Sequence, residues 1–146
     1  MANRRRQAAY ENAFPADVAR LSGVRRLTTA HARLWGLDTT AVDDAELIVD
    51  ELFTNAVRHG SRTGDHVTLS LVLDGPELHI AVGDTGRGTP QRHIPGPGDE
   101  SGRGLFLIDA LAAKWGVDHV GATGQRTWAV LTLPSRPAGR DPQTAA

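Results

Sequence analysis

The stretch ELFTNAVRHG, residues Glu51 to Gly60, combines an apolar helix face with two polar groups of the kind found in binding sites. Its apolar residues recur at helical spacing, while Glu51 and Asn55 stand four positions apart. Residues at that spacing lie one above the other on an α-helix, so a carboxylate and a carboxamide point to one region. Because such pairs are also common on solvated helix faces, the meaning of this one depends on the rest of the chain.

This helix is the second of two that the hydrophobic periodicity predicts. Apolar residues at helical spacing predict a first helix from about Asp17 to Trp35, and Gly36 then ends it. Asp38 or Thr39 can cap the second helix, and Gly60 suits the left-handed position just past its C-terminus.

Alternating apolar and polar residues predict the strands. The segments 67–73 and 78–82 alternate around an Asp-Gly-Pro turn, which predicts a β-hairpin with one buried face. After a Gly/Pro-rich loop, a helix is expected to begin near Gly104, and segments 115–120 and 127–133 are expected to be strands. Helices would then cover one face of a mostly antiparallel, mixed sheet, which is an α+β fold in the form of a two-layer α/β sandwich.

Length and composition limit the possible classes of protein. The chain has 146 residues, enough for one domain, which we expect at 11–134 between a flexible basic arm at 1–10 and a disordered tail at 135–146. The 16 basic and 17 acidic residues give a net charge of -1, so direct binding to nucleic acid or a membrane is not expected. Without cysteine, a signal peptide or a membrane-spanning apolar run, we expect a soluble cytoplasmic protein.

Two glycine-rich boxes follow the helix that carries Glu51 and Asn55. DTGRG, Asp84 to Gly88, leaves a predicted strand, and SGRGL, Ser101 to Leu105, opens a predicted helix. Alone, each box is explained by a tight turn or a glycine-rich helix entry. The order of the three motifs along one chain is the informative observation.

With the three motifs together, the sequence resembles the ATP-binding domain shared by histidine kinases, type II topoisomerases, ninety-kilodalton heat-shock chaperones and anti-sigma factor kinases. The resemblance runs from about Asp17 to Leu133 and implies the Bergerat ATP-binding fold. The runs RLWGLD, from Arg33, and DALAAKWGV, from Asp109, resemble the small anti-sigma factor serine/threonine kinases of actinobacteria. That subgroup implies ATP and Mg²⁺ as cofactors, an anti-sigma antagonist protein as phosphoacceptor, a sigma factor as a further partner, and a homodimer.

The chemistry of the residues agrees with what the resemblance implies. Mg²⁺ keeps several waters and takes few protein ligands beside phosphates, so the amide oxygen of Asn55 suffices as its protein ligand. The resemblance implies that Glu51 is the catalytic base for attack on the γ-phosphate. Asp84 is an acceptor suited to the exocyclic amine of adenine. Gly86 and Gly88 lack the Cβ atoms that would keep a base away from the turn.

The second glycine box suggests a phosphate-binding element. Gly102 and Gly104 offer backbone N–H groups at a helix N-terminus, where the helix dipole favours phosphate. Arg103, between the two glycines, carries a forked guanidinium that can hold a phosphate oxygen. Leu105, the last residue of this box, is also expected at the nucleotide site.

The last predicted strand departs from the pattern of the subgroup. There a glycine is followed two residues later by a threonine that helps to hold the adenine, whereas here Arg126 follows Gly124 at that step and Thr127 comes one later. Because a shift of one residue moves a side chain to the other face of a sheet, the role of Thr127 as a nucleotide contact stays open.

Two other functions also stay open. The shifted threonine and the short, proline-rich segment 89–101 favour a non-catalytic module that sequesters a protein partner, either with bound ATP or as a degenerate domain that binds no nucleotide. A detached histidine kinase catalytic domain would act on a histidine of a separate protein, since this chain has no room for a phosphoacceptor hairpin before Asp17.

Overall fold

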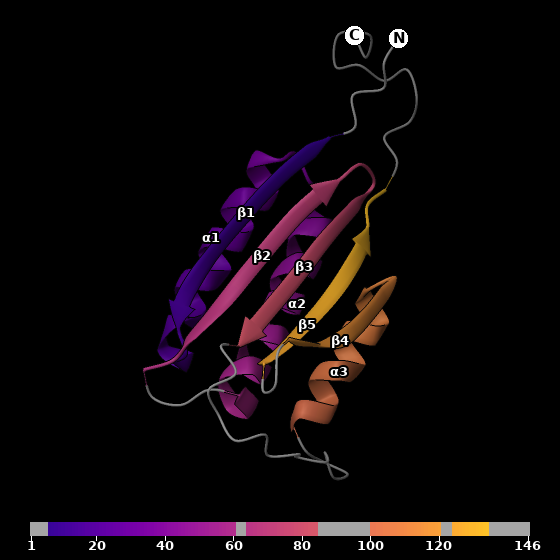
Figure 1. Ribbon diagram of the computed structural model, residues 1–146. Coiled ribbons are helices and arrows are strands. Elements are labelled where there is room, and N and C mark those ends of the chain that lie inside the picture. Colours follow the sequence, from indigo (N-terminus) through magenta and orange to yellow (C-terminus); the bar gives the residue numbers. More distant parts are fainter. Residues whose placement is uncertain (1–5, 61–63, 85–99, 121–123, 135–146) are drawn as a thin grey trace, which may run out of the picture.

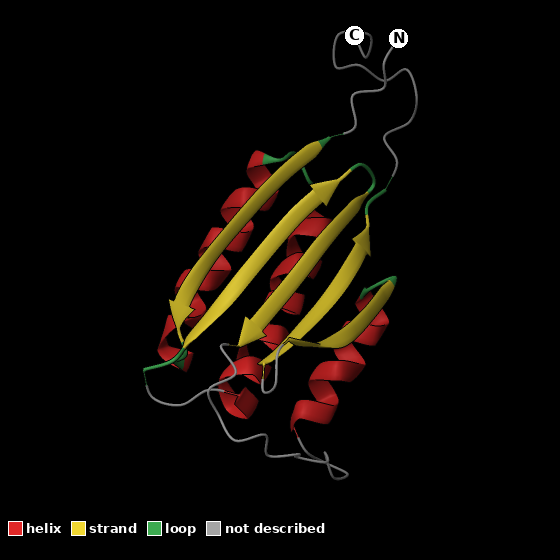
Figure 2. Cartoon of the chain, in the orientation of Figure 1, coloured by secondary structure: helices red, strands yellow, loops and turns green. Residues whose placement is uncertain are grey.

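The computed structural model describes residues 6–60, 64–84, 100–120 and 124–134. Its sheet has the strand order β1-β2-β3-β5-β4, and all four ladders between these strands are antiparallel. The helices lie together on one face of this sheet (Figures 1 and 2), so the predicted α+β two-layer sandwich is confirmed. The elements are β1 (Gln7–Pro15), a 3-10 turn (Val18–Arg20), α1 (Leu21–Leu34), α2 (Thr39–Gly60), β2 (His66–Asp74), β3 (Glu77–Asp84), α3 (Glu100–Leu111), β4 (Lys114–Val120) and β5 (Gly124–Thr132).

The register of the sheet gives each strand one face toward the helices. In β2 the buried positions are Val67, Leu69, Leu71 and Leu73, every second residue, as the alternation predicts. Leu71 pairs with Ile80 of β3, and both belong to the core. Figure 2 shows the opposite face of the sheet without a helix over it.

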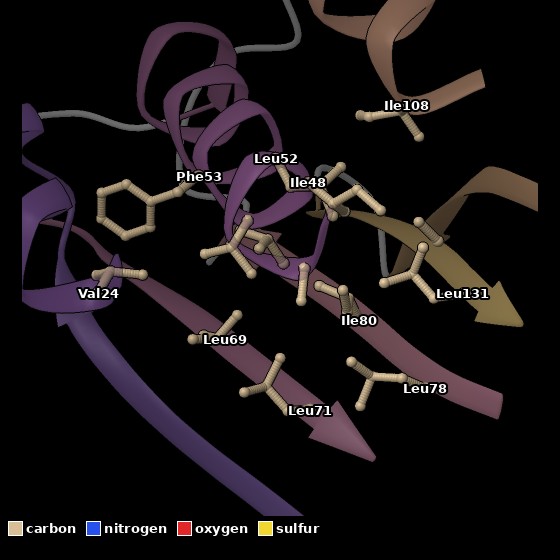
Figure 3. Packing of buried hydrophobic residues seen from close by; sticks show 14 of the residues in the cluster. Val24, Ile48, Leu52, Phe53, Leu69, Leu71, Leu78, Ile80, Ile108 and Leu131 are labelled. Atoms are coloured by element: carbon tan, nitrogen blue, oxygen red, sulfur yellow. The ribbon is translucent and has the colours of Figure 1, made fainter. Parts of the chain in front are cut away.

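Helix α2 is the centre of the helical layer. It is 22 residues long and lies between α1 and α3 over the middle of the sheet (Figure 1). Phe53, Ile48 and Leu52 are fully or almost fully buried in the core shared with the sheet, and the Phe53 ring points toward Val24 of α1 (Figure 3). Burying a side chain of this size contributes roughly 1.5–3 kcal/mol, so α2 and the sheet stabilise each other. Among the described helices, none is long and apolar enough to cross a membrane.

The start of α2 follows the capping rules. The Oδ1 atom of Asp38 accepts a hydrogen bond from the backbone N–H of Ala41 at 2.8 Å, so Asp38 rather than Thr39 is the capping residue. The preceding Gly36 has φ 81°, a left-handed conformation that stops α1 at low cost and turns the chain into α2.

The first strand was missing from the sequence prediction, which assigned residues 1–10 to a flexible arm. Residues Gln7–Pro15 instead form the edge strand β1, paired with β2 along its whole length. The Tyr10 ring stacks on His31 of α1 with centroids 3.9 Å apart, and Phe14 meets Phe53 edge to face at 6.4 Å. The alternation of Ala8, Tyr10 and Phe14 was the available sequence signal.

Helix α3 begins earlier than predicted. The sequence placed its start near Gly104, whereas the helix runs from Glu100 to Leu111. The two glycines of the SGRGL box therefore do not interrupt the helix, because the contacts of its later residues with α2 and β4 outweigh the weak intrinsic preference of glycine. Ile108 is buried in the core, and Trp115 of β4 donates its indole N–H to Asp109 of α3 at 2.9 Å.

Candidate functional site

Four segments that are distant in sequence meet at one end of the molecule. There β3 ends at Asp84, β5 begins at Gly124, α3 begins at Glu100, and α2 completes its C-terminal half (Figure 1). Helix α2 contacts β3, β5 and α3. The predicted site residues on these four segments therefore lie at one edge of the layer between helices and sheet.

The contacts of α2 with α1 determine which way Glu51 and Asn55 face. The Nε of Arg25 in α1 binds Oδ1 of Asp50 at 2.5 Å, and Glu46, one turn earlier, also accepts a hydrogen bond from α1. Asp50 also raises the pKa of the Arg25 guanidinium, chiefly through this hydrogen bond and then through its charge. At 100° per residue, Glu51 and Asn55 lie on the opposite flank of α2, which is the flank toward α3.

Asp84 faces the helical layer at the end of β3. It pairs with Val67 of β2, which is completely buried on that side, and paired residues point to the same face. Its Oδ1 atom accepts a hydrogen bond from the backbone N–H of Gln125 at 3.2 Å. The carboxylate thus joins the end of β3 to the beginning of β5.

The register of β5 resolves the orientation of Thr127. Thr127 pairs with Val82, a core residue, and is only 7% exposed. Arg126, one residue earlier, points to the opposite face and lies 3.8 Å from the carboxylate of Asp118. Thr127 therefore shares a face with Asp84, and Arg126 does not.

Two polar groups at this end lack hydrogen-bond partners within the described part of the chain. The Thr127 hydroxyl and the half-buried Asn55 carboxamide make no side-chain hydrogen bond to any described residue. A buried polar group without a partner costs about 1–3 kcal/mol, so such groups usually have one. Their position fits a ligand that brings its own donors and acceptors, as a nucleotide does.

The SGRGL box lies in the first turns of α3. Since α3 begins at Glu100, Gly102 stands in the first turn, where backbone N–H groups have no acceptor inside the helix. Gly104 is the fifth residue, and the i to i−4 pattern gives its N–H an acceptor within the helix. Gly102 is therefore the better placed of the two glycines for a backbone contact with phosphate, and such a contact by either glycine stays a prediction.

The other predicted residues are located only in part. The backbone of Arg103 and Leu105 belongs to the same turns of α3. Gly86 and Gly88 lie outside the described residues, so the DTGRG box is represented by Asp84 alone.

One residue at this end was missed by the sequence reasoning. Gln125 lies two positions before Thr127 on β5 and so has the same orientation, toward the helices and beside Asp84. The signal was available as the period of two in a strand, but it could be used only once the orientation of Thr127 was known.

The fold and the arrangement of these residues define a class of protein. Residues 14–131 match the histidine kinase-like ATPase domain, and the chain belongs to that family. The resemblance predicted from ELFTNAVRHG, DTGRG and SGRGL is therefore confirmed.

Proteins similar to this chain include the following two. An uncharacterized protein of Streptomyces coelicolor is 39% identical over 75 residues, which are 49% of this chain and 70% of that protein. The crystal structure of the RsbU and RsbW domains of Rv1364c from Mycobacterium tuberculosis matches over 90% of this chain with a TM-score of 0.64 and 25% identity. The match covers 34% of that chain, so this protein spans about a third of its length.

Proposed function

We propose that this protein is an ATP- and Mg²⁺-dependent serine/threonine kinase of the anti-sigma factor type, which phosphorylates a small antagonist protein in a partner-switching pathway. Membership of the histidine kinase-like ATPase family supports the binding of ATP. Similarity to a structure that contains an RsbW domain supports the anti-sigma type within that family.

One observation carries the proposal. Asp84 and the buried Thr127 share the helix-facing side of the sheet, and Glu51 and Asn55 lie on the flank of α2 nearest to α3 at the same end. This arrangement supplies acceptors, a hydroxyl and an amide at the edge of an apolar core, which is the composition expected of a ligand pocket.

The sheet side suits the base of the nucleotide. Asp84 keeps its carboxylate oriented through the N–H of Gln125, and an ionised carboxylate accepts from the exocyclic amine of adenine. The Thr127 hydroxyl of β5 lies diagonally opposite Asp84 of β3 on the same face of the sheet. It can both donate a hydrogen bond to the base and accept one from it. Apolar neighbours such as Val82 exclude water from the base.

The helix side suits the phosphates and the reaction. When bound, ATP supplies the γ-phosphoryl group, and Mg²⁺ compensates the phosphate charge. Asn55 would contribute its amide oxygen to the ion. Glu51 would take the proton of the attacking serine or threonine hydroxyl, whose oxygen forms a bond to the γ-phosphorus as the bond to the β–γ bridging oxygen breaks. Gly102 would direct its backbone N–H toward a phosphate oxygen from the first turn of α3.

Calorimetric titration with Mg·ATP tests the binding half of the proposal. We expect saturable binding by the native chain and weaker binding by Asp84→Asn and Asn55→Ala, with the Asn55 variant losing most of its Mg²⁺ dependence. Arg126→Ala is the matched control, because this exposed residue lies one position from Thr127 on the opposite face. If the folded native chain does not bind ATP, a kinase function is excluded, and a module that only sequesters proteins becomes the better explanation.

Transfer of labelled γ-phosphate to candidate antagonist proteins tests the catalytic half. We expect an acid-stable phosphoester on a serine or threonine, lost in Glu51→Gln with ATP binding retained. An acid-labile phosphate on a partner histidine would instead support a detached histidine kinase domain. Sedimentation of the protein with and without a sigma factor tests the homodimer and the second partner.

A further inference from the structure

Gln125 occupies the position beside Asp84 on the helix-facing side of the sheet. It follows Gly124 at the start of β5 and pairs with His119 of β4. Its backbone N–H donates to Oδ1 of Asp84, so the first atoms of its side chain start next to that carboxylate. A ligand group that reaches Asp84 therefore passes within reach of the Gln125 carboxamide.

The carboxamide of Gln125 makes no hydrogen bond that would hold the described part of the fold together. The side chain is half-buried, and within the described ranges it makes no hydrogen bond to protein. Its neighbour Arg126 shows the contrasting case, an exposed side chain on the other face that pairs with Asp118 at 3.8 Å. A polar side chain that is half-buried, faces inward and lacks a partner is available to a ligand.

The two side chains together match the hydrogen-bonding edge of one purine. Adenine presents a donor, the 6-amino group, directly beside an acceptor, N1. An ionised carboxylate only accepts, whereas a carboxamide can donate through its NH₂ group. Hypoxanthine and guanine present the reverse order, an acceptor at position 6 and a donor at N1, so the carboxylate of Asp84 would face an acceptor in place of the 6-amino group.

We propose that Gln125 is a base-specificity residue, which donates a hydrogen bond to N1 of adenine while Asp84 accepts from the 6-amino group. This inference rests on the proposed ATP site and adds to it a direct protein contact with N1. The backbone hydrogen bond to Asp84 remains in every Gln125 variant, so the two contacts can be separated experimentally.

The test compares ATP with 1-deaza-ATP, in which a C–H group replaces N1, by calorimetric titration in the presence of Mg²⁺. We expect the native chain to prefer ATP by roughly five- to tenfold, the effect of one neutral hydrogen bond. Gln125→Ala should bind both nucleotides equally, with an affinity close to that of the native chain for 1-deaza-ATP. Gln125→Met, which keeps most of the side-chain volume, should behave in the same way.

Arg126→Ala is the matched control and should keep the native preference for ATP. If Gln125→Ala or Gln125→Met, folded by circular dichroism, retains the native ratio between the two nucleotides, the contact with N1 is refuted while the ATP site stands. If the native chain binds ATP and 1-deaza-ATP equally, the inference is likewise wrong. If the native chain binds neither, the proposed function itself fails.

Discussion

Replacement of Thr127 by valine separates the stability of the protein from its proposed ligand binding. Thr127 is 7% exposed, and its hydroxyl makes no hydrogen bond within the described part of the chain. Valine has almost the same shape and a higher preference for strands, so the substitution removes a buried, unpaired hydroxyl without leaving a cavity. We expect the free energy of unfolding to rise by about 1 kcal/mol, which corresponds to roughly 3–6 °C in melting temperature.

Binding should change in the opposite direction. Because the hydroxyl lies beside Asp84, loss of its contact with a nucleotide should weaken Mg·ATP binding roughly five- to tenfold. The assays are urea unfolding followed by circular dichroism and calorimetric titration with Mg·ATP. A variant that is more stable and yet binds ATP less well is difficult to explain unless the hydroxyl serves the ligand.

A second buried threonine supplies the control. Thr28 of α1 is completely buried, but its hydroxyl donates to the carbonyl of Val24 at 2.9 Å. Thr28→Val should therefore lower the free energy of unfolding by about 0.5–1 kcal/mol, without an effect on ATP binding. If Thr127→Val instead destabilises the protein as much as Thr28→Val does, the Thr127 hydroxyl has a structural partner and the reasoning is refuted.

Three further predictions concern the fold. Gly116→Ala would bring a Cβ to 2.6 Å from Cζ2 of Trp128 and should lower the free energy of unfolding in urea by about 1–3 kcal/mol. Gly23→Ala, whose Cβ would meet open space, should raise the free energy of unfolding by about 0.5 kcal/mol. Equal effects of the two substitutions would contradict the close packing of Gly116 against Trp128. Asp50→Asn should cost about 0.5 kcal/mol at low salt and less at 1 M salt, because salt screens this part-buried ion pair only in part, and a cost that does not fall with salt would mean that the lost interaction is not ionic. Tyr10→Ala should cost about 2–3 kcal/mol by thermal melting, and an unchanged melting temperature would mean that β1 does not stabilise the domain.

Much of the fold could be predicted because its elements have strong local patterns. The helix that carries Glu51 and Asn55 and the hairpin of β2 and β3 have clear periods in the sequence, and both are confirmed, although Gly60 is the last residue of α2 and not the residue just past its end. Strand β1 was missed because it has few apolar residues on its inner face and Asn12 interrupts them. The strand is stabilised by its pairing with β2 and by the stacking of Tyr10 on His31. The start of α3 was misjudged because glycine preferences are weak beside tertiary contacts.

The sequence by itself determined which chemical groups are present and in what order they follow one another. The spacing of Glu51 and Asn55 sets them on one flank of a helix, because helix geometry is local. The motif order was also enough to predict the family that the match over residues 14–131 establishes.

Only the tertiary structure decided which of these groups meet. The contacts of α2 with α1 determine which flank of α2 faces α3. The pairing of β5 with β3 determines the face of the sheet on which the Thr127 side chain lies. A strand has two equivalent faces until its partner fixes the register, so the motif alone could not distinguish Thr127 from Arg126. For the same reason Gln125, which no motif marks, becomes a neighbour of Asp84 only in the folded sheet.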